Sequence, residues 1–83
     1  MAEVTVDQVA RVHNYGDQTA VTARVDIATT GDVWTPGLRS IETIICAPRT
    51  NLSDVALNAA RNQVVFTIGG AVADVDITVV GFP

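Results

Sequence analysis

Hydrophobic and polar residues alternate with a period of two in two segments of the chain, residues 20–28 and 73–80. The first alternates Val21, Ala23, Val25 and Ile27 with Thr22, Arg24 and Asp26, and the second alternates Ala73, Val75, Ile77 and Val79 with Asp74, Asp76 and Thr78. This period predicts β-strands with one face in the core. A helix is disfavoured in both segments because β-branched residues lose side-chain freedom in a helix and pack well on a pleated sheet.

The N-terminal segment predicts a further strand with one irregularity. Val4 and Val6 alternate, whereas Val9 and Val12 are out of phase with them. A β-bulge near residues 7–8 would restore the register.

Turn-forming residues separate the predicted strands. Residues 13–17 favour a hairpin turn, and residues 29–37 favour a loop that contains Trp34. Within this loop, Pro36 and Gly37 suit the two central positions of a type II turn.

Residues 38–47 and 63–68 also have strand character. In the first of these, alternation puts Ile41, Thr43, Ile45 and Ala47 on one face and Ser40, Glu42, Ile44 and Cys46 on the other. Its second half is apolar on both faces, so we expect it to be covered twice, by the core and by something else. After residues 63–68, Gly69 and Gly70 favour a turn because glycine tolerates positive φ.

Residues 51–61 fit two structures. Ser53 could cap a helix that ends at Arg61, or residues 55–59 could form a strand that turns at residues 60–62 into the next one. The strand is favoured because the surrounding chain is β and a hairpin follows at once. We therefore expect one mainly β domain over residues 1–83, a small antiparallel β-sandwich or barrel with at most one short helix.

The composition predicts self-association. Of the 83 residues, 48% are hydrophobic and 17% are charged, and none is lysine. A domain of this size buries only about 60–65% of the surface of its unfolded chain, so surplus apolar surface needs a partner.

The charge pattern argues against direct contact with nucleic acid. Five arginines face nine carboxylates, for a net charge of -4, and the arginines are scattered along the chain. Phosphate binding needs a basic patch. No signal peptide or membrane span is expected, because the start lacks a basic region followed by an apolar core and the apolar runs are short.

The residue set predicts no catalytic, cofactor or metal site. Cys46 is the sole cysteine and His13 the sole histidine, which excludes an intrachain disulfide and a Cys/His zinc site. His13 with Asp17 could form an acid/base pair, but an exposed turn histidine is favoured. Asp74 and Asp76 on one strand face could bind a hard cation, but a solvated face is favoured because calcium sites need more oxygen ligands on a turning loop.

Two residues have alternative structural roles. Trp34 could fold over a core edge or anchor an interface, as large aromatic residues often do. Cys46 is expected to be a buried small hydrophobe, with pairing across a symmetry axis as the alternative.

Three segments carry a resemblance to a known class of protein: residues 37–44, residues 62–71 and residues 73–82. They have a Gly-Leu-x-x-Ile opening before a central strand and a glycine-aromatic pair, Gly81-Phe82, at the end of the last strand. This pattern resembles small structural proteins of tailed bacteriophages and related viruses. The resemblance implies a compact β-sandwich or barrel that decorates or cements the capsid, commonly as trimers, or belongs to the head-tail or tail apparatus.

The expected function is therefore that of a non-enzymatic virion structural protein, a decoration or cement protein that binds its own copies and the major capsid protein or other virion proteins. Its location would be the virion, assembled in the host cytoplasm. The interface candidates are Trp34, Ile44, Cys46 and Phe82. The main alternative is a carbohydrate-binding or adhesin β-sandwich module, which would normally display several exposed aromatic residues for sugar stacking; a small hydrolase is a more distant third.

Overall fold

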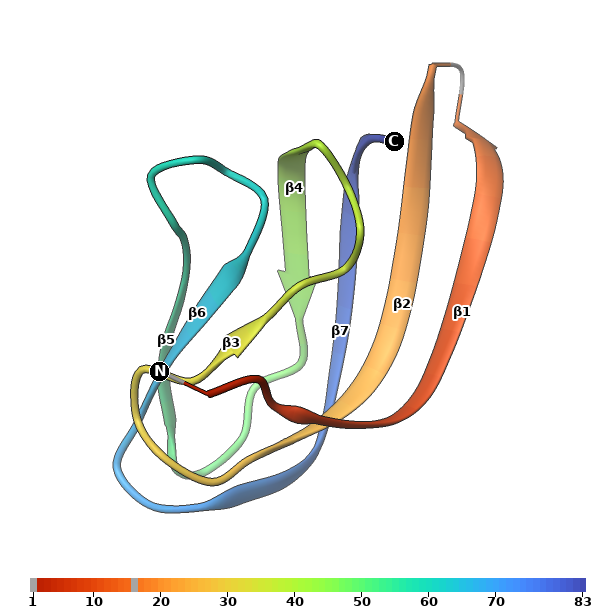
Figure 1. Cartoon of the computed structure of the whole chain (residues 1–83). Coiled ribbons are helices and arrows are strands. Elements are labelled where there is room, and N and C mark those ends of the chain that lie inside the picture. The colour runs from red at the N-terminus through yellow and green to blue at the C-terminus, as the bar shows by residue number, and fades with distance from the viewer. Residues whose placement is uncertain (1, 16) are drawn as a thin grey trace.

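In the part of the chain that the structure describes, seven strands form two antiparallel sheets that pack against each other (Figure 1). The structure is a computed structural model that describes residues 2–15 and 17–83, with the side chains of residues 12–15 left out of the description. The strands are β1 (Thr5–Tyr15), β2 (Gln18–Ile27), β3 (Val33–Trp34), β4 (Ser40–Cys46), β5 (Leu52–Leu57), β6 (Val64–Ile68) and β7 (Val72–Phe82). No helix occurs among the described residues, which confirms the predicted mainly β fold.

The larger sheet has the strand order β1-β2-β7-β4, and the smaller one has the order β3-β6-β5. The two segments with the clearest alternation, β2 and β7, are the central strands of the larger sheet and pair with each other. Their apolar faces point to the core, where Val25, Val75 and Val79 are fully buried. The smaller sheet contributes Val64 and Phe66 of β6 from the opposite side.

The N-terminal residues connect the two sheets. Glu3 forms an isolated parallel bridge with Val33 of β3, and the N–H of Val4 donates to the Val33 carbonyl at 2.8 Å. The chain then enters β1 in the larger sheet, so both sheets are tied together at this side. β1 lies at the far end of the larger sheet from β5 and β6 (Figure 1).

The ambiguous segment is a strand rather than a helix. β5 pairs with β6, and the turn between them is built around the Asn58 side chain, whose Oδ1 accepts the N–H groups of Asn62 and Gln63 at 3.0 Å each. Arg61 in this turn has a φ of 60°. The hairpin thus gives the backbone N–H and C=O groups of this segment hydrogen-bond partners in β6 and in the turn, in place of the internal hydrogen bonds of a helix.

The bulge predicted near residues 7–8 is confirmed. The β1–β2 register shifts between Val6 and Gln8, which leaves Asp7 as the extra residue. The predicted hairpin between β1 and β2 is also present, with Tyr15 opposite Gln18, but residues 13–15 of the predicted turn belong to β1 and residue 16 lies outside the described residues.

Two further bulges correct the predicted strand faces. In β4, Ile41 pairs with Gly81 and Thr43 with Val80, so Glu42 is the extra residue. Strict alternation had placed Ile41 with Ile45, but the bulge turns Ile41, Ile44 and Cys46 toward the core.

In β7, the residues 73 and 74 lie opposite the single residue Asp26 of β2. Asp74 has a φ of 57°, in the left-handed region, so a bulge interrupts the regular alternation that the sequence predicts here. The Asp74 N–H donates to Asp26 Oδ1 at 2.9 Å, which helps to hold this conformation.

The loop around Trp34 is partly as predicted. Gly37 has a φ of 87°, as the third residue of a type II turn requires. Trp34 itself lies in the short strand β3, paired with Val64, and is only 2% exposed. Of its two expected roles, packing in the core is the one that the structure bears out. Gly69 and Gly70 lie at a turn between β6 and β7, but neither has a positive φ.

Candidate interaction surface

Among the side chains that the structure describes, the exposed large hydrophobic ones are Val6, Val9 and Ile45, at 41%, 61% and 61% exposure. They come from β1 and β4, the two outermost strands of the larger sheet. The surplus of apolar residues in the composition is therefore concentrated at the two edges of one sheet.

On β4, apolar side chains point to both sides. Ile44 and Cys46 are half-buried and pack against the core. They line a groove of about 300 Å³ between β4 and β5, together with Leu52 and Val55 of the facing sheet. Ile45 points the other way, onto the outer face beside Thr78. The second half of this strand thus has a second apolar face that the described residues leave uncovered, as its sequence predicts.

On β1, the exposed valines lie on the same side as the core. Val6 pairs with Val25 and Val9 with Ala23, and directly paired residues of antiparallel strands share a face. The partners on β2 are buried, whereas residues 5–11 of β1 are all exposed. The three-stranded sheet is one strand narrower than the four-stranded sheet, so β1 extends beyond the part of the larger sheet that the smaller sheet covers.

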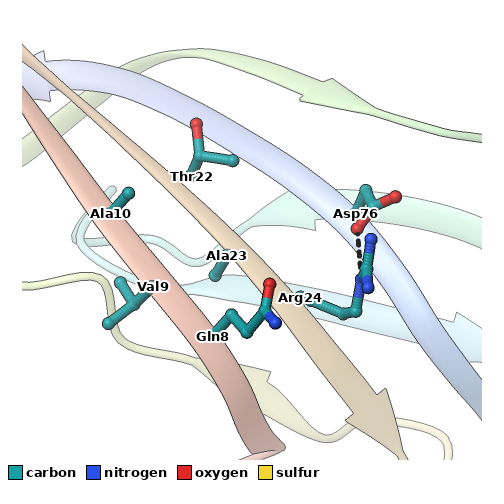
Figure 2. Close-up of a pocket in the computed structure, with 7 residues that line it drawn as sticks. All are labelled: Gln8, Val9, Ala10, Thr22, Ala23, Arg24 and Asp76. Carbon is teal, nitrogen blue, oxygen red and sulfur yellow. Dashed lines mark hydrogen bonds and ion pairs between the residues drawn. The ribbon is translucent and has the colours of Figure 1, made fainter.

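The outer face of the larger sheet has a shallow hollow of about 440 Å³ (Figure 2). Gln8 and Ala10 of β1, Thr22 and Arg24 of β2, and Asp76 of β7 contribute to its lining. Arg24 Nε donates to Asp76 Oδ1 at 2.9 Å, and this hydrogen bond lowers the pKa of the Asp76 carboxyl. Both side chains are about half exposed, so the pair contributes little to stability. The charges neutralise each other, and the hollow offers no nucleophile with an adjacent base.

Three carboxylates gather beside this hollow. Asp7 of the β1 bulge, Asp26 of β2 and Asp74 of the β7 bulge present oxygen atoms that all lie within 4.8 Å of one another. Desolvation raises the pKa of Asp7, and the adjacent Asp26 and Asp74 charges raise it further. Carboxylate oxygens are the ligands that hard cations prefer, so these three residues could hold such an ion.

The sequence pointed to another pair, Asp74 and Asp76, as the potential cation ligands. Asp76 is instead bound to Arg24. Asp7 could have been noticed from the phase slip in β1, whereas the β7 bulge that brings Asp74 to Asp26 left no mark in the alternation.

The remaining predicted residues are distributed over the molecule. Phe82 is half-buried at the end of β7, opposite Ser40. Cys46 is a free cysteine. Burial raises the pKa of its thiol, and the negative charge of Asp76 raises it further. The side chain of His13 lies outside the described residues, so the pair with Asp17 is not described either.

No known protein family, curated protein or solved structure matches this chain. In the described part of the chain, no helix is long and apolar enough to cross a membrane.

Proposed function

We propose that this protein is a non-enzymatic structural component of a virion, a decoration or cement protein that binds to the head and to copies of itself. The observation that carries the proposal is the uncovered side of β4, with Ile45 61% exposed on a strand whose other side packs against the core. Exposed apolar residues on an edge strand are a liability for a free monomer, since they invite association. They are useful in a protein that functions in an assembly.

The chemistry of the described residues supports a non-enzymatic role. The sole cysteine has a raised thiol pKa, which disfavours the nucleophilic thiolate. The hollow on the outer face contains one neutralised ion pair, and its titratable groups are not arranged as a nucleophile with a base.

The aromatic residues weigh against the carbohydrate-binding alternative. Sugar stacking needs exposed rings, but Trp34 is 2% exposed and Phe66 is fully buried. Phe82 is half-buried, and the Tyr15 side chain lies outside the described part of the chain. No fully exposed aromatic side chain therefore occurs among those the structure describes.

The test is co-sedimentation with shells assembled from the major capsid protein encoded in the same genome. We expect the wild type to sediment with the shells and Ile45→Asp to lose this binding, because a charge would be buried without a partner in an apolar contact. Thr22→Asp is a matched control, since Thr22 is an exposed residue of the same outer face and lies two strands from β4. The proposal would be contradicted if the genome that encodes this protein encodes no capsid protein, or if the shells do not bind the wild-type protein. Equal loss of binding in both variants would also contradict it.

A further inference from the structure

The two edges of the larger sheet complement each other. β1 forms one edge and β4 the other, and each is paired on one side only within the described residues. We propose that β1 of one copy adds to the free edge of β4 in the next copy, so that Val6 and Val9 cover the groove between β4 and β5. This head-to-tail contact deepens the proposed function by naming the surface of self-association, but it does not require a shell.

The backbone directions allow this addition. Neighbouring strands in β1-β2-β7-β4 are all antiparallel, so β1 and β4 run in opposite directions. A second sheet placed in line with the first therefore continues the antiparallel alternation. Unpaired N–H and C=O groups along an edge strand bind an extended segment, which identifies a strand as the occupant.

The open stretches of the two edges can pair over four residues, with residues 8–11 opposite residues 42–45. The free edge of β4 is closed at Ile41, whose N–H donates to the Arg61 carbonyl at 2.7 Å and whose carbonyl accepts a hydrogen bond from Arg61 Nη2. Residues 42–46 remain open beyond it. In β1, the bulge ends at Gln8, and regular pairing runs over residues 8–12.

The apolar side chains also match. In a continuous sheet the inner faces of both copies are aligned, so Val9 would lie on the same side as Ile44 and Cys46. Val9 is the exposed residue of the β1 edge, and Ile44 and Cys46 are the half-buried groove residues of the β4 edge. The wider sheet of one copy supplies the strand that the open side of its neighbour lacks.

Charge complementarity sets the register. With Val9 opposite Ile44, antiparallel pairing puts Arg11 opposite Glu42. Arg11 Nη2 donates to the Pro36 carbonyl of its own chain at 2.7 Å, so its remaining guanidinium N–H groups would face Glu42. Opposite charges on directly paired residues stabilise a sheet, and like charges destabilise it. Pairing two β1 edges would leave the groove open, and pairing two β4 edges would leave Val6 and Val9 exposed. Only the contact between unlike edges covers both surfaces.

Disulfide trapping tests the contact and its register. Val9→Cys and Ile44→Cys are combined in a Cys46→Ser background, and the protein is mildly oxidised at high micromolar concentration. A disulfide across directly paired residues requires Cβ atoms about 3.5–4.5 Å apart. We expect a ladder of covalent dimers and larger species on a denaturing gel. Val9→Cys with the native Cys46 tests the register shifted by two residues.

Two matched controls separate this contact from random collisions and from symmetric pairing. Ala10→Cys replaces Val9→Cys on the opposite face of β1, so it should give no ladder with either β4 cysteine. Val9→Cys alone in the Cys46→Ser background should also stay monomeric on the gel. Circular dichroism checks that every variant keeps the β spectrum of the wild type.

The outcomes are distinct. A ladder that forms only when Val9→Cys is combined with a cysteine on β4 supports the contact. If the capsid shells do not bind this protein but the ladder forms, the virion role fails and the contact stands. No ladder from either pair, an equal ladder with Ala10→Cys, or cross-linking through Val9→Cys alone would each overturn the contact. Because the contact joins unlike surfaces, it closes into a ring when the rotation allows and otherwise forms a filament, and sedimentation distinguishes the two.

Discussion

Replacement of Gly81 by alanine should destabilise the fold by overlap with the backbone of a neighbouring strand. Gly81 is buried in β7 between β2 and β4, where it pairs with Thr19 and Ile41. A Cβ atom at this position would overlap the Ser40 carbonyl oxygen and lie 2.9 Å from the Ile41 Cα. Backbone atoms cannot rotate away as the end of a side chain can, so β4 would have to move.

The magnitude follows from two destabilising effects and one that offsets them. Overpacking a well-packed site costs about 1–3 kcal/mol. A weakened ladder hydrogen bond between β4 and β7 adds about 1 kcal/mol. The reduced freedom of the unfolded chain offsets about 0.4–1 kcal/mol. The expected net loss is about 1–3.6 kcal/mol, which lowers the melting temperature by several degrees per kcal/mol in a domain of this size.

Urea titration of Gly81→Ala beside two control variants checks this reasoning. Gly69→Ala has no heavy atom within 4 Å of its new Cβ and no positive φ, so it should be neutral or slightly stabilising. Gly31→Ala also has open space but a φ of 88°, so it should lose about 1 kcal/mol through conformation alone. If Gly81→Ala were as stable as Gly69→Ala, the close approach of β4 to β7 would be refuted.

Three further predictions concern single residues. Gly37→Ala should lose at least about 1 kcal/mol in the same titration, because Gly37 has a φ of 87° and its new Cβ would displace Arg11; unchanged stability would refute the turn. The pKa of Asp7 is raised in the folded state, so this carboxyl stabilises the fold below its pKa in the unfolded chain, and this contribution is lost as the pH rises through its pKa in the folded protein. Asp7→Asn should therefore reduce the fall in stability with rising pH across this interval, and an unchanged stability profile would contradict the carboxylate cluster. The raised pKa of the Cys46 thiol should make it react more slowly with a thiol reagent near pH 8 than the same cysteine in urea, and equal rates would count against its burial.

The alternation of residues determined the central strands. β2 and β7 were predictable because each has one face in the core and one outside, which leaves a period of two in the sequence. The bulge at Asp7 was predictable for the same reason, since Val4 and Val6 are out of phase with Val9. These features depend on residues that are near one another in the chain.

The bulges in β4 and β7 were decided by tertiary structure. In β4, both faces are apolar after Glu42, so a slip by one residue left no change in the pattern. In β7, Asp74 and Asp76 look like a regular polar face, but the pairing of residues 73 and 74 against Asp26 rotates Asp74 toward Asp7. The carboxylate cluster exists because two bulges on either side of β2 lie close together, one between the partners of Arg24 and Val25 and the other opposite Asp26.

The interaction surface shows the same division. Composition predicted surplus apolar surface, and the doubly apolar stretch near Ile44 predicted part of its location. The burial of Trp34, the exposure of Val9 and the groove beside Cys46 depend on which strands lie at the sheet edges and how far each sheet extends. A sequence fixes which side chains alternate along a strand, but only the pairing of distant strands decides which of them the opposite sheet covers.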